Sequence, residues 1–231
     1  MGKRLLLLSS SRVYGGGYLD HAEPLVRDYL KEVSRVLFVP YALKDKAGYA
    51  AVARQKFEAM GFRLDSVHES ADPKQAIVSA EALFVGGGNT FRLLNTLYEL
   101  DLLPVIRQRV YSGMRYMGAS AGSNIAGPTI KTTNDMPIVQ PPSFASLGLV
   151  PFQINPHYVD ADPGSTHMGE TREQRLREYL EENDTPVLAI REPAIIHVEG
   201  DVVTLEGESG AKIFRRGHEP QEVPSGSVVE I

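Results

Sequence analysis

The sequence predicts an α/β protein with a doubly wound, mostly parallel sheet flanked by helices and with antiparallel C-terminal edge strands. Short apolar runs recur along the chain and end in turn residues, as expected for strands that are covered on both faces. Amphipathic helical patterns separate these runs until about residue 192, and such alternation is typical of a parallel α/β sheet. Strand-like segments alone follow that point.

The predicted strands of the parallel sheet are short and apolar on both faces, and several are rich in β-branched residues. They cover residues 4–8, 36–39, 82–85, 115–117, 153–155 and 186–190. The predicted helices between them carry apolar residues on one face. They cover residues 18–31, 49–60, 91–100, 104–111 and 171–180.

The C-terminal part differs in pattern from the rest of the chain. Its strand-like segments are separated by short turns containing glycine, which favours antiparallel pairing. They cover residues 195–198, 202–205, 211–214 and 227–231. No repeat, linker or low-complexity segment interrupts the 231 residues. We therefore expect residues 1–231 to form a single α/β domain around one sizeable core.

Composition excludes several classes of function. The net charge of -5 makes nucleic acid an unsuitable partner, because an acidic surface repels phosphates. The chain has no cysteine, which excludes disulfides, cysteine-ligated metals and a thiol nucleophile. No apolar run approaches the roughly 20 residues of a membrane span. We expect a soluble, cytoplasmic protein that needs no membrane.

The segment Gly118-Ala119-Ser120-Ala121-Gly122 has the G-x-S-x-G pattern and lies where a predicted strand gives way to a helix. A sharp turn of this kind exposes the serine oxygen, and small neighbours avoid clashes. The N–H of the next residue then faces the oxyanion that develops during attack on a carbonyl. The pattern is frequent by chance, and a helix-capping serine would also explain it. Its position between strand and helix favours Ser120 as a nucleophile.

A second glycine-rich turn, Gly86-Gly87-Gly88-Asn89, also follows a predicted strand and precedes a helix. It lacks the spacing of a dinucleotide fingerprint and the lysine of a Walker loop. We favour a role in which its backbone N–H groups support the oxyanion over a phosphate site. The turn Gly15-Gly16-Gly17 is best explained as a flexible surface loop.

Six histidines are candidates for the general base. They are His21, His68, His157, His167, His197 and His218. His157 stands out, because the proline of Asn155-Pro156-His157 fixes the exit from an apolar strand. The imidazole would then lie at the carboxyl edge of the sheet, where sites form in open α/β folds.

A serine–histidine pair also needs a carboxylate that orients the imidazole. Glu192 follows a predicted strand and therefore lies at a suitable edge. Asp135 would reproduce the Ser–Asp–His chain order of the α/β-hydrolases, and Asp160 is a further candidate. The residues alone leave these alternatives open.

Taken together, these segments resemble the peptidase E family of α-aspartyl dipeptidases, which have the class I glutamine-amidotransferase-like fold. The resemblance covers residues 5 to about 193, in the order that the family shows. The resemblance is based on residues 85–91, 118–122, 132–139 (TTNDMPIV), 153–157 (QINPH) and 169–175 (GETREQR). The N-terminal loop and the C-terminal strands match more loosely.

The resemblance implies cleavage of dipeptides after an N-terminal aspartate by a serine peptidase without metal or other cofactor. It implies Ser120 as nucleophile, His157 as base and Glu192, in preference to Asp135, as the orienting acid. The family has a glycine where this chain has Pro193 after that glutamate, and this departure bears on the pose of Glu192.

The remaining roles follow in the same way. The oxyanion donors would be the N–H groups of Ala121 and of Gly87 or Gly88. Arg172 would bind the aspartyl carboxylate of the substrate, and Asn89 would also contact substrate. An arginine fork grips both oxygens of a carboxylate. The ordinary explanation of Arg172 is pairing with glutamates on a solvated helix.

Three further expectations concern alternatives and partners. Cyanophycinase, a relative with a similar serine turn, is the second enzymatic interpretation, although residues 132–139 and 169–175 fit peptidase E better. A non-catalytic nucleotide- or ligand-binding domain is the rival from another class. The expected partner is a small peptide with an N-terminal aspartate, and a homodimer is an assembly that these expectations allow.

Overall fold

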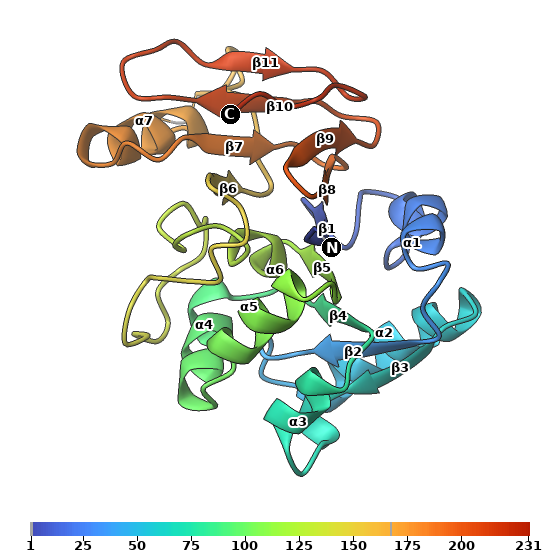
Figure 1. The fold of residues 1–231 in the computed structure, drawn as a ribbon. Coiled ribbons are helices and arrows are strands. Elements are labelled where there is room, and N and C mark those ends of the chain that lie inside the picture. Colours follow the sequence, from blue (N-terminus) through green and yellow to red (C-terminus); the bar gives the residue numbers. More distant parts are fainter. Residues whose placement is uncertain (1, 167) are drawn as a thin grey trace.

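The computed structural model describes residues 2–166 and 168–231, which form a mixed α/β fold with a large sheet and a small one. Figure 1 shows the small sheet, in orange and red, beside the large sheet and its helices. The predicted fold class is confirmed: the large sheet is mostly parallel and flanked by helices. No helix in the described ranges is long and apolar enough to cross a membrane.

The large sheet has seven strands in the order β3-β2-β4-β5-β1-β8-β9. Five neighbouring strands run parallel to one another, and β8 and β9 extend the sheet in antiparallel fashion. In chain order the strands are β1 (Arg4–Leu8), β2 (Arg35–Val39), β3 (Arg63–Ser66), β4 (Ala82–Val85), β5 (Arg115–Ala119), β8 (Ile195–Glu199) and β9 (Val202–Glu206). The strand order reverses between β2 and β4, and sites form at such switch points.

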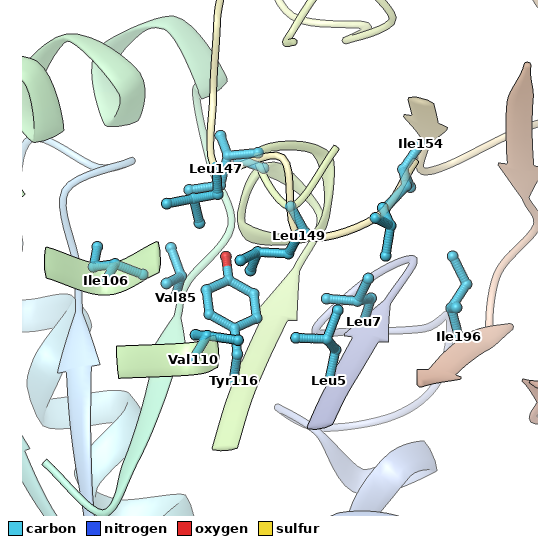
Figure 2. Packing of buried hydrophobic residues seen from close by; sticks show 14 of the residues in the cluster. Leu5, Leu7, Val85, Ile106, Val110, Tyr116, Leu147, Leu149, Ile154 and Ile196 are labelled. Carbon is cyan, nitrogen blue, oxygen red and sulfur yellow. The ribbon is translucent and has the colours of Figure 1, made fainter. Parts of the chain in front are cut away.

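Helices cover both faces of this sheet because its strands are apolar on both faces. In β1, Leu5 and Leu7 point into one buried cluster, and Leu6 and Leu8 point into the other. Figure 2 shows the first cluster, where Tyr116 packs among aliphatic side chains. One face is covered by α3 (Pro73–Val78), α4 (Thr90–Glu99) and α5 (Leu103–Tyr111), and the other by the short helix η1 (Asp20–Ala22), α1 (Glu23–Tyr29) and α2 (Lys46–Ala59).

Caps in the sequence set where several helices begin. Asn89 accepts a hydrogen bond from the Arg92 N–H at the start of α4, and Asp45 does the same for Gly48 in α2. The helix α7 (Arg172–Glu182) begins at a capping box. Such caps satisfy backbone N–H groups that have no partner within the helix.

The small sheet has the order β11-β10-β7-β6 and carries α7 against it. Its strands are β6 (Gln153–Asn155), β7 (Val187–Ile190), β10 (Ala211–Phe214) and β11 (Gln221–Val223). The pair β6–β7 is parallel, whereas β10 is antiparallel to both of its neighbours. Residues 153–155, 186–190 and 211–214 were therefore wrongly expected in the main sheet.

Three local predictions differ from the structure. The expected strand at 227–231 is reduced to an isolated bridge between Thr204 and Val228, and β11 lies just before it. The strand β3 has no counterpart among the predicted strands, because its buried and exposed residues alternate and it does not form an apolar run. The helix α3 has six residues, too few for a helical pattern to stand out.

Candidate active site

Ser120 lies at the turn between β5 and α6 (Ala121–Asn124), with φ 53° and ψ -109°. Such a positive φ is uncommon for a residue with a side chain and marks a constrained turn. The turn is held by hydrogen bonds from Ser120 N to the Leu8 carbonyl, 3.0 Å, and from Asn124 N to the Ser120 carbonyl, 2.9 Å. The predicted strand–turn–helix placement of this serine is present.

The two glycines of the motif are required by packing around the turn. A Cβ on Gly118 would lie 2.4 Å from the Gly122 carbonyl oxygen, and one on Gly122 would lie 2.1 Å from that of Val85. Both contacts are with backbone atoms, which cannot move aside cheaply. The strand β4, which contains Val85, therefore packs directly against the serine turn.

His157 contacts Ser120 directly. Its Nε2 lies 2.7 Å from Ser120 Oγ, within the range of a proton-transfer hydrogen bond. His157 follows β6, which is in the small sheet and not in the main sheet where it was expected, and has φ 54°. Its own N–H donates to Ser9 Oγ at 2.9 Å.

Glu192 is the carboxylate that reaches this histidine, through a contact between Oε1 and His157 Nδ1. Pro193, in place of the family's glycine, does not prevent this contact. The other two candidates lie elsewhere. Asp135 Oδ2 accepts from Thr90 N at 2.7 Å and from Thr90 Oγ1 at 2.6 Å, and Asp160 pairs with Arg191 and Lys212.

Ser9, immediately after β1, connects the segments that carry the histidine and the glutamate. Its hydroxyl accepts from His157 N and donates to the Ile190 carbonyl at 2.9 Å, and its side chain is fully buried. The sequence analysis did not identify this residue. The only signal was its place directly after a strand, at the edge that also carries Ser120.

An ion pair braces the same two segments from the outside. The Arg191 guanidinium donates two hydrogen bonds to Asp160, of 2.6 and 3.0 Å. Asp160 lies three residues after His157, and Arg191 directly precedes Glu192. Arg191, helped by Lys212, lowers the pKa of Asp160 to about 2 against the opposing effect of partial burial.

This shift predicts how the Asp160→Asn variant depends on pH. A carboxyl whose pKa is lower in the folded state stabilises the fold above its unfolded value of about 3.9 and loses that effect as the pH falls towards 2. The stability deficit of the variant should be about 1 kcal/mol or less at pH 7, because water screens the half-exposed pair. Urea unfolding at a series of pH values should show this deficit shrinking between pH 4 and 2; a deficit independent of pH would contradict the assignment.

Two backbone N–H groups beside Ser120 have no acceptor within the described part of the chain, those of Gly88 and Ala121. Gly88 has φ 130°, and a Cβ there would lie 2.8 Å from the Ala42 carbonyl oxygen. Gly87 packs against the serine, since a Cβ on it would be 3.0 Å from that of Ser120. Burial raises the pKa of Tyr49, while a hydrogen bond with the Gly87 backbone lowers it.

A cavity of about 800 Å³ opens onto the serine and the histidine, a size typical of small-molecule sites. Fourteen residues line it, among them Asp135, Gly87 and Gly88. Arg172, the first residue of α7, is not among them. Burial lowers the pKa of Arg172, the neighbouring Arg175 adds to this, and the charge of Asp135 opposes it.

The charges on α7 separate Arg172 from its neighbours. Arg175 pairs with Glu170 at 3.4 Å, and Arg177 pairs with Glu173 at 3.0 Å. Arg172 has no carboxylate within ion-pair distance among residues 2–166 and 168–231. Ion pairs on a solvated helix therefore explain Arg175 and Arg177, but they do not explain Arg172.

Asn89 serves the local structure with both ends of its amide. Its Oδ1 caps α4, and its Nδ2 donates to the Met136 carbonyl at 2.9 Å. Met136 directly follows Asp135, so Asn89 helps to position that carboxylate. One amide N–H of Asn89 remains for a ligand.

Of the candidate histidines in the described ranges, only His157 forms a hydrogen bond with Ser120, although His21 interacts with the charge of Glu192 and with the Ser10 backbone. His68 contacts Ser66 Oγ at 2.6 Å and His218 contacts the Arg216 carbonyl at 2.9 Å, while His21 lies in η1 and His197 in β8. His167 lies outside the described residues. Within those ranges no group of three or more His, Asp or Glu side chains is arranged to hold a metal ion.

Known proteins match this chain over most of its length. Residues 5–206 match the peptidase family S51. The chain belongs to peptidase family S51. It is 56% identical over 223 residues to "Peptidase E" of Streptomyces coelicolor, covering 96% of this chain and 92% of the relative. It is 50% identical to the "Probable alpha-aspartyl dipeptidase" of Drosophila melanogaster, covering 92% and 90%.

Solved structures agree on the fold of family S51. A peptidase from an acI-B1 actinobacterium superposes with a TM-score of 0.73 at 17% identity, covering 100% of this chain and 98% of the other. At that identity the likeness bears on the fold alone. The family that the sequence motifs indicated is confirmed, and this S51 chain is a peptidase.

Proposed function

We propose that this protein is a serine dipeptidase that hydrolyses Asp-Xaa dipeptides with an N-terminal α-aspartate through an acyl-enzyme. The observation that carries the proposal is the continuous line of contacts from Ser120 Oγ through His157 to Glu192. The names of relatives at 50% and 56% identity support the same activity. Arg172, which has no ion-pair partner among the described residues, supports the preference for aspartate.

The proposed reaction is acyl transfer to Ser120. His157 Nε2 takes the hydroxyl proton as Ser120 Oγ attacks the aspartyl carbonyl carbon. The resulting oxyanion accepts hydrogen bonds from the N–H groups of Gly88 and Ala121. The intermediate collapses, the C–N bond breaks, and the leaving amine takes the proton from His157 Nε2.

The second half of the reaction regenerates the enzyme. Water attacks the ester carbonyl and gives a proton to His157 Nε2, and that proton returns to Ser120 Oγ as aspartate leaves. Throughout, Glu192 accepts a hydrogen bond from His157 Nδ1–H, fixes its tautomer and stabilises the imidazolium. Only groups on this chain and water are needed for these steps.

Asp135, which lines the cavity, and Arg172, whose pKa is lowered by burial and raised by the charge of Asp135, carry opposite charges that suit an N-terminal aspartate. Arg172 would pair with the β-carboxylate of the substrate through its planar fork. Asp135 would accept a hydrogen bond from the free α-ammonium group of the substrate. The hydrogen bonds that Thr90 donates to Asp135 fix the position of this carboxylate. A substrate without either charge would leave one of these groups desolvated and unpaired, which costs free energy.

The Arg172→Ala variant should lose activity on aspartyl substrates selectively. Removing one partner of a desolvated charge pair costs about 2–5 kcal/mol, or roughly 30- to 5,000-fold in kcat/KM. Steady-state rates on Asp-Leu, Asn-Leu, Glu-Leu and Ala-Leu measure this: the preference of the wild type for Asp-Leu should collapse in the variant. Arg175→Ala is the matched control, since Arg175 already pairs with Glu170. An equal loss on all four dipeptides would contradict the role of Arg172.

A further inference from the structure

Arg12 lies in the loop between β1 and η1, and hydrogen bonds fold this loop into a defined shape. The Arg12 N–H donates to Ser10 Oγ at 3.1 Å, and the same hydroxyl donates to the Arg12 carbonyl. Farther along, Gly16 N donates to the Val13 carbonyl at 3.0 Å and Leu19 N to the Ser11 carbonyl at 2.7 Å. The glycine-rich segment, expected as a surface loop, is exposed at residues 14–16 and contains a hydrogen-bonded turn next to Arg12.

The guanidinium of Arg12 is placed at the cavity that contains the serine. Arg12 lines this cavity together with Ser120 and His157, and its Cζ lies 5.8 Å from the centroid of the Tyr18 ring. Tyr18 is 8% exposed, so a fixed aromatic face holds the side chain by a cation–π contact. Tyr18 in turn packs edge-on against Tyr49, with 6.3 Å between ring centroids.

This guanidinium has no anionic partner among residues 2–166 and 168–231. Across the described ranges, its side chain forms neither an ion pair nor a hydrogen bond. The carboxylate of Asp45, which also lines the cavity, accepts from the N–H of Gly48 as the cap of α2. Arg12 therefore presents an uncompensated positive charge to the cavity.

Arg12 and Arg172 belong to different surroundings. Arg172 lies in the first turn of α7 and interacts with the charge of Asp135. Arg12 lies in the loop after β1, over the ring of Tyr18. The lining of the cavity is largely apolar and includes Leu43 and Val52. Such walls suit the variable side chain of a leaving amino acid better than they suit the charged aspartyl residue.

We propose that Arg12 binds the terminal α-carboxylate of the residue that follows aspartate in the substrate. This inference rests on the proposed aspartyl dipeptidase function. At neutral pH an Asp-Xaa dipeptide carries one ammonium group and two carboxylates, and Asp135, Arg172 and Arg12 offer the complementary charges. Arg12 would thus favour dipeptides over longer peptides, whose second residue has no free carboxylate.

The test compares three substrates that differ after aspartate: Asp-Leu, Asp-Leu amide and aspartyl p-nitroanilide. The wild type should prefer Asp-Leu to its amide by about tenfold in kcat/KM, the size of one charge-assisted contact at an exposed site. Arg12→Ala should lose about tenfold on Asp-Leu, mainly through a higher KM, and less than twofold on the other two. Arg12→Lys should recover part of the loss, because it keeps the charge without the fork.

Lys46→Ala is the matched control. Lys46 also lies over an aromatic ring, 5.3 Å from that of Tyr41, but it does not line the cavity, and its removal should leave the preference unchanged. A wild type without preference for the free carboxylate, or an Arg12→Ala loss equal on Asp-Leu and its amide, would overturn the inference. Turnover of aspartyl p-nitroanilide by the wild type keeps the proposed function intact in either case. Failure to cleave any of the three substrates would overturn both.

Discussion

Replacing Ser120 by alanine should lower kcat on Asp-Leu by about 10⁵-fold or more, the scale seen when a serine nucleophile is removed. Ser120 Oγ is the atom 2.7 Å from the histidine base, and alanine cannot form the acyl-enzyme. The fold should be retained, because alanine can adopt the backbone conformation of this turn about as readily as serine. The substitution also leaves the backbone hydrogen bonds of residue 120 in place. Steady-state kinetics and a thermal melt of the same preparation measure both effects.

The double variant Ser120→Ala/His157→Ala provides the control for this prediction. Groups that act as one unit lose their effect together, so the double variant should be hardly worse than either single one. A variant that folds and retains more than about one hundredth of the wild-type kcat would contradict the role of Ser120 as nucleophile, given the magnitudes expected.

Replacing Glu192 by alanine should lower kcat by about 10³-fold. This decrease is somewhat smaller than the one that follows removal of a buried triad acid. Glu192 contacts His157 Nδ1 and in the proposed mechanism fixes its tautomer, but its side chain is 39% exposed. Water can therefore replace part of the lost hydrogen bond. The kcat of Glu192→Ala, measured at saturating Asp-Leu from pH 6 to 9, tests this expectation.

Asp135→Asn is the matched comparison, since it removes the rival carboxylate with little change in volume. Asp135 bonds to Thr90 and not to the histidine, so this variant should raise KM for Asp-Leu more than it lowers kcat. The assignment of Glu192 would be wrong if Asp135→Asn lost more in kcat than Glu192→Ala.

Much of the fold could be predicted because parallel strands covered on both faces form continuous apolar runs. The pattern of residues 4–8 and 82–85 is of this kind, and these residues lie in the large sheet. The same apolar pattern does not say which neighbour a short strand pairs with. Residues 153–155 and 187–190 are buried throughout, yet they pair in the small sheet.

The site could be predicted in part, because strand ends of the same polarity bring their following residues to one edge. The principle applies to Ser120, which follows β5 of the large sheet, whereas His157 follows β6 of the small sheet. The bare sequence left Glu192, Asp135 and Asp160 open. Glu192 follows a predicted strand and Asp135 gives the chain order of the α/β-hydrolases, whereas the distinction depends on side-chain direction. Ser9 gave no chemical signal, since its role depends on two backbone groups, those of His157 and Ile190.

Arg172 and Arg12 show a related limit of sequence reasoning. An Arg among glutamates on a helix is ordinarily explained by ion pairs, and Arg175 and Arg177 follow that rule. Arg172 departs from it only because its position at the first turn of α7 brings it near Asp135. Arg12 lies in a loop without a helical or strand pattern, so only the folded turn places it at the cavity.

The central claim is that Ser120 is a nucleophile in a site that selects aspartate. The most direct measurement is intact-protein and peptide mass spectrometry after reaction with a diphenyl phosphonate built on aspartate and with its leucine analogue. The aspartate compound should leave one adduct per chain, on the peptide that contains Ser120, and should react much faster than the leucine analogue. An absent adduct, an adduct on another residue, or equal rates for both compounds would contradict the claim.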